Sequence, residues 1–328
     1  MGSGGRGRRR GGRGGPAPRA GGRPGRSRAS APREPYDLAG ELRAEAQRER
    51  SGARERRPPE RRRGGGDLSQ RVLIAIPAAL FAIFIVTRGG LVLAVGLIAL
   101  GVLSLHELYT MMGRAHPVNL AGFLALAGLV LAATYGEQQQ IVLALAAAFP
   151  LTFLLAVARP QRENVAWGIA ATLLGVAWVG LAMAHAVLLR DLDHGDGLLI
   201  DVLVGTFIGD TVAYFGGKLY GRRKLAPVIS PNKTVEGLVL GILGGTAAFW
   251  FAGLYQDWLS GLDALAIGFA VALAAPIGDL FESMVKRDLD VKDAGRFFGA
   301  HGGVLDRLDA VFFSVVAAYY VTLALGAG

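Results

Sequence analysis

The sequence predicts an all-α, polytopic integral membrane protein with about nine transmembrane helices, preceded by a disordered tail rich in arginine and glycine. Composition is the first observation behind this prediction, because 52% of the 328 residues are hydrophobic and the mean hydropathy is +0.39. Ordinary soluble domains are less apolar. The second observation is a series of apolar runs from Val72 onward, most of them close to the 20 residues that a helix needs to cross a bilayer.

The positive charge of the chain gathers in residues 1–67, the predicted tail. This segment holds nineteen of the 35 basic residues and eight of the 26 acidic ones, so residues 68–328 carry a small excess of acidic side chains. The tail has few apolar residues to bury and is predicted to be disordered. Such a tail can bind RNA, but beside a membrane anchor we favour contact with anionic lipid that keeps the N-terminus in the cytoplasm. No specific nucleic-acid partner is expected.

Two features are excluded by the sequence. A cleaved signal peptide is not expected, because no small-residue cleavage site follows the first apolar run and further spans come after it. The chain has no cysteine, which excludes disulfides and thiolate metal ligands.

Nine apolar segments are predicted to span the membrane. With the N-terminus in the cytoplasm, the inner connections hold thirteen Lys and Arg residues, and the outer connections hold only Arg88 and Arg190. This asymmetry follows the positive-inside rule, so we expect a multi-pass protein of the plasma membrane with its C-terminus outside. The first two segments are short and could form a tight hairpin through residues 88–90. The predicted segments are 71–87, 90–106, 118–134, 139–157, 165–188, 197–216, 237–255, 263–281 and 308–326.

Carboxylates lie in or beside three of these segments, near their inner ends. Asp210 lies in the sixth segment, Asp279 is at the end of the eighth with Glu282 next to it, and Asp306 and Asp309 open the ninth. An ionisable group at such depth is costly unless it is paired, and it indicates a functional site by default. The alternative is that each carboxylate pairs with a neighbouring Lys or Arg and only holds helices together.

Helical spacing aligns several polar side chains with these carboxylates. Asp210 and Tyr214 share a helix face, and Ser283 and Lys286 follow Asp279 at intervals of four and seven. Pro276 is expected to kink the eighth helix and to free backbone carbonyls beside a polar cavity. Oxygen ligands without cysteine suit a hard cation such as Mg²⁺.

Basic residues and glycines fill the two inner loops that adjoin the carboxylates. Lys233 comes just before the predicted start of the seventh helix, where backbone amides and a lysine together make a natural phosphate seat. In the second loop the glycines of the stretch "GAHGG" allow close approach of the backbone to a phosphate. Carboxylates for a cation, combined with basic loops for several phosphates, indicate phosphoryl-group chemistry at a membrane face. The cations of the second loop are Lys286, Arg287, Lys292 and Arg296.

One long motif connects the chain to a known family. It reads Ser283-x-x-Lys286-Arg287, then Lys292-Asp293-x-Gly295, then His301-Gly302-Gly303-x-x-Asp306-Arg307-x-Asp309. Together with Asp210-x-x-Ala213-Tyr214 and "KLAPVISPNKTVEG", it resembles the signature of the phosphatidate cytidylyltransferase (CDP-diacylglycerol synthase) family. The resemblance is dense over residues 205–310, within a transmembrane cytidylyltransferase domain expected at 68–328. It departs mildly at Gly299-Ala300, where the family often has Pro-Gly, and at Lys218, where Arg is common.

The resemblance implies a Mg²⁺-dependent enzyme of phospholipid biosynthesis at the cytoplasmic membrane face, with a second cation left open. Its substrates would be CTP and phosphatidic acid, and its products CDP-diacylglycerol and pyrophosphate. Membrane lipids are the other expected partners, and a homodimer is left open. Metal binding is assigned to Asp210 and Asp279. The assigned catalytic residues are Asp279, Lys286, Asp306, Asp309 and His301, and the assigned substrate-binding residues are Tyr214, Ser230, Lys233, Ser283, Arg287, Lys292 and Arg307.

Two other functional classes remain open from the sequence. A CTP-using lipid kinase of related membrane architecture would place the γ-phosphate of CTP, rather than its α-phosphate, in the lipid. A transporter would use the buried carboxylates for ions and would not depend on a nucleotide, but it leaves the basic loops unexplained. CDP-alcohol phosphotransferases are disfavoured, because their DG-x-x-AR arrangement is absent.

Overall fold

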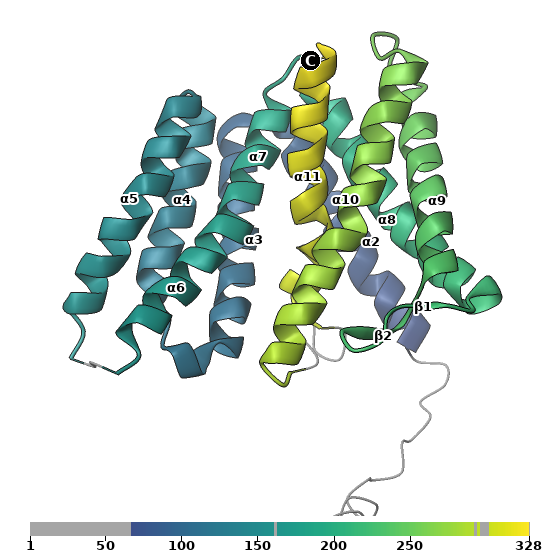
Figure 1. Ribbon diagram of the computed structural model, residues 1–328. Helices are drawn as coiled ribbons and strands as arrows, with labels where there is room; N and C mark the ends of the chain where they lie inside the picture. Colours follow the sequence, from purple (N-terminus) through teal and green to yellow (C-terminus); the bar gives the residue numbers. More distant parts are fainter. Residues whose placement is uncertain (1–66, 161–162, 292–293, 296–301, 328) are drawn as a thin grey trace, which may run out of the picture. The chain divides into compact units, whose positions relative to one another are not determined.

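A computed structural model describes residues 67–327 except 161–162, 292–293 and 296–301, with side chains from Ile76 onward. The described chain is helical apart from one short hairpin (Figure 1). The predicted disorder of residues 1–67 falls almost entirely outside the described residues. The helices are α2 (Asp67–Arg88), α3 (Gly90–Met111), α4 (Asn119–Tyr135), α5 (Gln138–Val157), α6 (Val165–Gly175), α7 (Leu181–Arg190), α8 (Gly195–Tyr220), α9 (Val235–Gly253), α10 (Gly261–Asp288) and α11 (Leu305–Leu325).

All nine predicted spans correspond to helical segments. Seven segments of the described chain are long and apolar enough to cross a membrane, with α6 and α7 counted as one segment over 165–190. Two shorter apolar helices, Ile76–Arg88 and Asn119–Tyr135, account for the first and third predicted spans. The helices α3, α8 and α10 continue past their predicted inner ends. A hydropathy pattern stops at the first charged residues, whereas a helix can carry charged final turns beyond the hydrocarbon.

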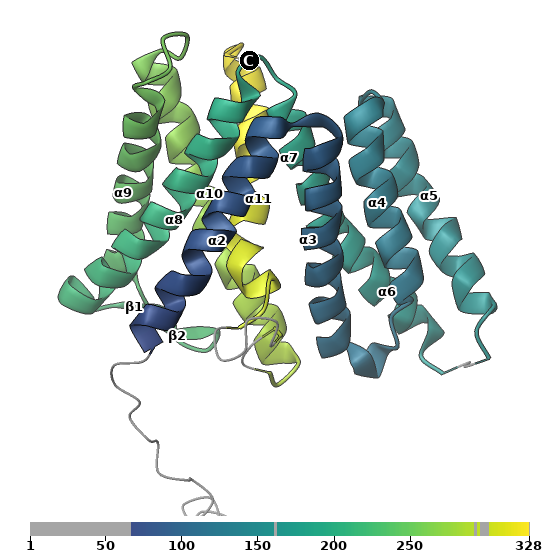
Figure 2. The same cartoon turned by 180° about the vertical axis from the view of Figure 1, so that it is seen from behind.

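Successive spans, with α6 and α7 taken as one, run in opposite directions, so alternate connections share an end of the bundle (Figure 1). Seen from behind, α2 crosses in front of α8 and α11 (Figure 2). The predicted tight hairpin between the first two helices is confirmed, because Gly89 and Gly90 have φ values of 62° and 47°, a region that glycine adopts without strain. Arg190 fastens this turn by donating from Nε to the carbonyl of Val86 at 2.8 Å.

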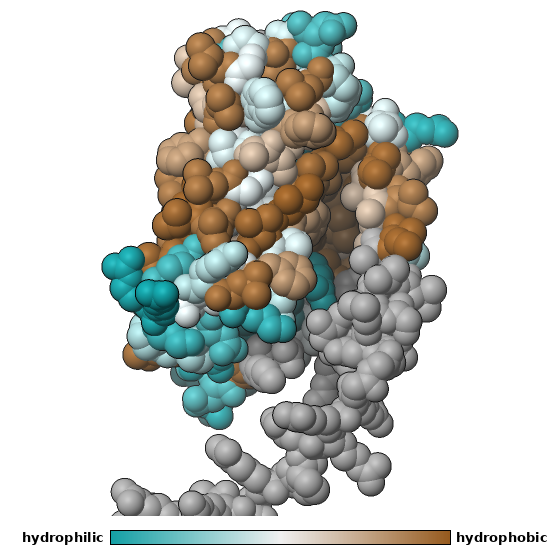
Figure 3. Space-filling view, turned by 90° about the vertical axis from the view of Figure 1, so that its right-hand side faces the viewer, coloured by the Kyte–Doolittle hydropathy of each residue, from teal (hydrophilic) through white to brown (hydrophobic). Residues whose placement is uncertain are grey.

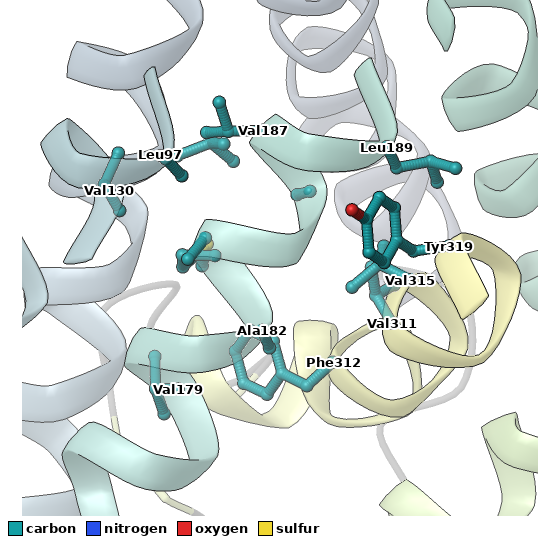
Figure 4. Packing of buried hydrophobic residues seen from close by; sticks show 14 of the residues in the cluster. Leu97, Val130, Val179, Ala182, Val187, Leu189, Val311, Phe312, Val315 and Tyr319 are labelled. Carbon is teal, nitrogen blue, oxygen red and sulfur yellow. The ribbon is translucent and has the colours of Figure 1, made fainter. Parts of the chain in front are cut away.

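The core of the bundle forms around α7 and α11. Val187 of α7 lies beside Leu97 of α3 and Val130 of α4, while Val311 and other apolar side chains of α11 lie on the opposite side of α7 (Figure 4). Burial of these side chains joins the first half of the chain to the second. The outer surface is different: on the face shown in Figure 3, apolar side chains cover the middle, and hydrophilic residues gather towards the lower end. Such an apolar surface suits contact with lipid.

The sixth span contains a π-helical segment, Val176–Gly180, that the apolar pattern does not predict. Its Trp178 makes edge-to-face contact with Phe281 of α10 at a ring-centroid distance of 4.7 Å, and with Phe312 of α11 at 6.2 Å. A π-helical turn holds one more residue than an α-helical turn, so it changes the helix face on which later side chains lie. The segment thus packs an indole against the two helices that carry four of the predicted carboxylates.

Small residues bring α8 and α9 unusually close together. A Cβ added at Gly237 of α9 would lie 2.7 Å from the backbone oxygen of Ala213 and 3.0 Å from Cα of Gly217. At Gly209, an added Cβ would lie 3.2 Å from Cα of Gly245. Helices in membranes gain van der Waals contact when small side chains let their backbones approach. This crossing holds the inner end of α8, with Asp210, beside the start of α9.

Replacing Gly237 by alanine is expected to lower the melting temperature in detergent by several degrees. The new methyl group would meet backbone atoms, which cannot rotate away, and overpacking of this kind costs about 1–3 kcal/mol. Gly128 of α4 is the matched control, because an added Cβ there meets no atom within 4 Å and alanine is the better helix former. Equal melting temperatures for Gly237→Ala and Gly128→Ala would contradict the close α8–α9 crossing.

A short antiparallel hairpin, not expected from the sequence, occupies the loop between α8 and α9. Its strands are β1 (Lys224–Ala226) and β2 (Ser230–Thr234), with Lys224 opposite Thr234. Thr234 is also the N-cap of α9, since its Oγ1 accepts the N–H of Gly237 at 3.1 Å. Glu236 shapes the approach to the hairpin by accepting the N–H of Arg222 at 2.9 Å. The hairpin therefore delivers Lys233 to the start of α9, as the sequence predicted for that lysine.

Candidate active site

The predicted carboxylates converge at one end of the bundle, where α8 and α10 approach their C-termini and α11 begins. Asp210 of α8 lies close enough to Asp279, Asp309 and Lys233 to interact with them electrostatically. Asp309 interacts in turn with Asp279 and Lys286. These groups come from three helices and a hairpin, so the prediction that the clusters reach one side of the bundle is confirmed.

Lys286 joins α10 to α11 through two ion pairs. Its Nζ lies 2.7 Å from Oε2 of Glu282 and 2.8 Å from Oδ1 of Asp306. The side chains of Lys286, Glu282 and Asp306 are only 15%, 1% and 14% exposed. A buried ammonium with two carboxylates is expensive to break, because removing one partner leaves an uncompensated charge. The sequence analysis assigned Lys286 a catalytic role, and the structure also makes it the link between two helices.

Lys233 forms the second cross-element ion pair. Its Nζ lies 2.5 Å from Oδ2 of Asp279, so strand β2 is held against α10. Asp279 also accepts a hydrogen bond from Ser283, one turn later, at 3.3 Å. The sequence analysis placed Asp279 and Ser283 on one face, and this is confirmed. The pairing of Asp279 with Lys233 across 46 positions of sequence was not predicted.

Asp306 organises the residues before α11. Besides its ion pair with Lys286, its carboxylate accepts the N–H of Gly303 at 2.8 Å and the N–H of Ala294 at 3.1 Å. Three different donors thus fix one carboxylate, which suits an orienting role. Asp309, one turn later, is buried and accepts the N–H of Ala310 at 2.8 Å.

The remaining predicted site residues are less tightly gathered. Arg287 donates from Nε to the carbonyl of Ile229 at 3.2 Å, which fastens the hairpin next to Ser230. Tyr214 is 64% exposed and packs edge-to-face on Phe215. Arg307 is exposed at the first turn of α11. His301 and Lys292 lie outside the described residues.

The sequence left open that the carboxylates only hold helices together. The geometry is compatible with this alternative for Asp279, Glu282 and Asp306, because each of them is paired with a lysine. In the described part of the chain, Asp210 and Asp309 form no such ion pair. Carboxylates on apolar helices that are not used in ion pairs between elements point to a functional role.

Asp210 also lines a small hollow between α8, α9 and α10. Thr206, one turn earlier on α8, lines the same hollow, and its buried hydroxyl has no hydrogen-bond partner among the described residues. Pro276 forms the wall on the side of α10, and α10 continues as a helix past it.

The donor set fits a hard divalent cation that is completed by a substrate. The described residues contain no group of three or more His, Asp or Glu side chains arranged to hold a metal by themselves. Mg²⁺ does not need such a cage, because it commonly binds one or two carboxylates together with substrate phosphates and waters. Asp210, whose side chain is exposed and lies beside Asp279, can supply one such carboxylate.

One residue at this site was missed by the sequence analysis. Glu107 of α3 is buried, and its Oε2 accepts the N–H of Leu305, the first residue of α11, at 2.9 Å. The predicted second span ended at residue 106, one position too early to count Glu107 as an intramembrane carboxylate. The same rule that selected Asp210 would have selected it, had the span been extended by one turn.

Comparison with known proteins agrees with this geometry. Residues 69–325 match the family described as the Cytidylyltransferase family. The phosphatidate cytidylyltransferase of Bacillus subtilis is 33% identical over 263 residues, which cover 78% of this chain and 97% of that protein. That of Staphylococcus epidermidis is 32% identical over 259 residues, covering 74% of this chain and 94% of that protein. That of Mycobacterium leprae is 36% identical over 168 residues, covering 50% of this chain and 53% of the relative, so the match spans about half of that protein.

Proposed function

The chain belongs to the cytidylyltransferase family, and from this premise we propose that it transfers CMP from CTP to phosphatidic acid. The family and the relatives make the chain a nucleotidyltransferase. Two of those relatives, matched over nearly their whole length, are phosphatidate cytidylyltransferases. One observation of this chain carries the proposal further: two lysines and the carboxylates of three apolar helices meet at one end of the bundle. A lipid phosphate and a nucleotide can both reach such a place.

In the proposed reaction an oxygen of the lipid phosphate attacks the α-phosphorus of CTP. The bond between the α-phosphorus and the bridging oxygen of the β-phosphate breaks, which gives CDP-diacylglycerol and pyrophosphate. The attacking phosphate is already ionised near neutral pH, so it needs no strong base to remove a proton. The task of the site is to hold two anions in line and to neutralise their charge.

The lysines supply positive charge for this task. Lys233 stands at the start of α9, where the free backbone N–H groups of the first turn also attract anions, and Lys286 is held in place by Glu282 and Asp306. Because its ion pairs fix the ammonium before substrate arrives, little reorganisation is needed when charge develops on the phosphates. Arg287 and Ser283 are close enough in sequence to contact the same phosphates from α10.

We further propose that Asp210 and Asp279 would hold Mg²⁺ for the reaction. When bound, the cation would neutralise phosphate charge and stabilise the leaving pyrophosphate. Lys233, which pairs with Asp279, would supply positive charge to the nucleotide phosphates from the start of α9. The positive-inside bias of the loops supports a cytoplasmic position for this end of the bundle and for the N-terminus, in the plasma membrane.

Labelled CTP tests the proposed function directly. Purified full-length protein in detergent, given phosphatidic acid and Mg²⁺, is expected to place the α-label of CTP in the lipid and to release the γ-label in pyrophosphate. A lipid kinase would place the γ-label in the lipid. A transporter would use neither label, and either of these results would refute the proposal.

Deleting residues 2–60 is expected to leave kcat in detergent within about threefold of the full-length value, since the deleted segment contains none of the assigned residues and has the composition of a disordered chain. The measurement is kcat of both proteins at saturating CTP and phosphatidic acid. A loss of more than about tenfold would show that the tail takes part in the reaction, while a loss only in membranes containing anionic lipid would support its electrostatic role.

A further inference from the structure

Glu107 is a buried carboxylate that the proposed reaction does not use. It belongs to α3, in the first half of the chain, yet it reaches the first residue of α11 almost 200 positions later. Its side chain is only 7% exposed, and Oε1 is buried without a hydrogen-bond partner among the described residues. A buried carboxylate with one oxygen left without a hydrogen bond lowers the stability of the fold. This cost indicates that Glu107 has a role other than stabilisation.

Two glycines close around this carboxylate. A Cβ added at Gly295 would lie 2.3 Å from Oε1 of Glu107, and one added at Gly303 would lie 2.2 Å from Oε2. Neither distance is compatible with a side chain. The sequence analysis attributed the glycines of "GAHGG", which include Gly303, to close approach of a phosphate. The geometry gives Gly303, and Gly295 as well, another role, which is to leave room for Glu107.

Glu107 and Asp306 both contact the residues that precede α11. Asp306 accepts the N–H groups of Ala294 and Gly303. Ala294 precedes Gly295, and Gly295 and Gly303 are the two glycines that pack on Glu107. The α11 helix has no side-chain cap at Val304. Glu107 takes over that function by accepting the N–H of Leu305, and its charge is favourable at a helix N-terminus.

We propose that Glu107 is a positioning residue, which fixes the first turn of α11 so that Asp306 meets Lys286. Through this contact the first half of the bundle sets the geometry of the site in the second half. The effect on activity rests on the proposed function, but the contact itself can be tested without it.

A double-mutant cycle between Glu107 and Gly303 tests the proposal. Glu107→Ala, Gly303→Ala and the double variant are prepared as full-length protein in detergent, and kcat, KM for CTP and melting temperature are measured. Gly303→Ala alone is expected to lower kcat at least about tenfold. In the Glu107→Ala background the same change should cost less than about threefold, because the methyl group enters the vacated space. Equal losses in both backgrounds would overturn the proposal.

The individual Glu107 variants separate positioning from general stability. Glu107→Ala is expected to lower kcat per folded enzyme about tenfold or more with KM for CTP within about threefold, because substrate-binding groups remain while their alignment is lost. Glu107→Gln keeps an acceptor for the N–H of Leu305 and should recover part of the lost kcat. An amide variant as slow as the alanine variant, or normal kcat per folded enzyme for Glu107→Ala, would contradict a positioning role.

Ser104→Ala is the matched control for the Glu107 variants. Ser104 is also fully buried and lies one turn earlier on α3, but its hydroxyl bonds only within its own helix, to Leu100 at 2.9 Å. It should keep kcat within about twofold. If Glu107→Ala does not accumulate, the cycle is run with Glu107→Asp, whose carboxylate retreats by one methylene. If the wild-type protein makes no CDP-diacylglycerol, the proposed function fails, while coupling in melting temperature still tests the contact.

Discussion

Asp279→Asn is expected to lower turnover of CTP by about 10²- to 10³-fold while the protein remains inserted and folded. The amide has the shape of the carboxylate and can still accept a hydrogen bond from Ser283, so packing is conserved. What is lost is the charge that pairs with Lys233 at 2.5 Å and that, in the proposed reaction, helps to bind Mg²⁺. The measurement is kcat at saturating CTP and phosphatidic acid, combined with the Mg²⁺ concentration that gives half-maximal activity.

Asp288→Asn is the control for this variant. Asp288 is an exposed carboxylate at the end of the same helix, and its neutralisation should leave kcat within about twofold. If Asp279 served only to hold β2 against α10, Asp279→Asn would lower the melting temperature and leave kcat per folded enzyme unchanged. That result, or a normal Mg²⁺ requirement in an active Asp279→Asn enzyme, would refute the assigned role.

Lys286→Ala is expected to reduce kcat/KM for CTP about 10²-fold or more. The change removes positive charge from the site and leaves Glu282 and Asp306 facing each other without their shared ammonium. Lys286→Arg should restore part of the activity, because the charge survives, although a planar guanidinium cannot reproduce the position of a point-like ammonium between two carboxylates. The measurement is kcat/KM for CTP with the folded fraction determined for each variant.

Arg114→Ala separates this role from membrane topology. Arg114 is an exposed cation at the same end of the bundle, in the turn between α3 and α4, and its loss should not alter kinetics. If Lys286 were only a topology marker, Lys286→Ala and Arg114→Ala would behave alike. Near-normal kinetics of Lys286→Ala with unchanged orientation would favour that simpler explanation.

Much of the site could be predicted because helical periodicity places residues on faces without reference to the rest of the fold. Asp279, Ser283 and Lys286 fall on one stripe of α10 in any helix of that sequence, and the structure places the first two in contact. The order of the apolar helices follows in the same way, from the length of each apolar run against the thickness of a bilayer. The carboxylates were expected at the same end of the bundle because successive spans alternate in direction.

Contacts between elements were decided only by tertiary packing. No pattern in the sequence shows that Lys233 pairs with Asp279, that Lys286 is shared with Asp306, or that Glu107 of α3 supports the start of α11. Each of these pairs depends on which helices are neighbours, how they are rotated and how closely they approach. The glycines between α8 and α9 determine how closely these two helices approach. The π-helical segment Val176–Gly180 changes the face on which the side chains after it lie. The sequence by itself thus determined which chemical groups reach this end of the bundle, and only the tertiary structure decided which of them meet, because pairing across helices is a property of packing and not of helical period.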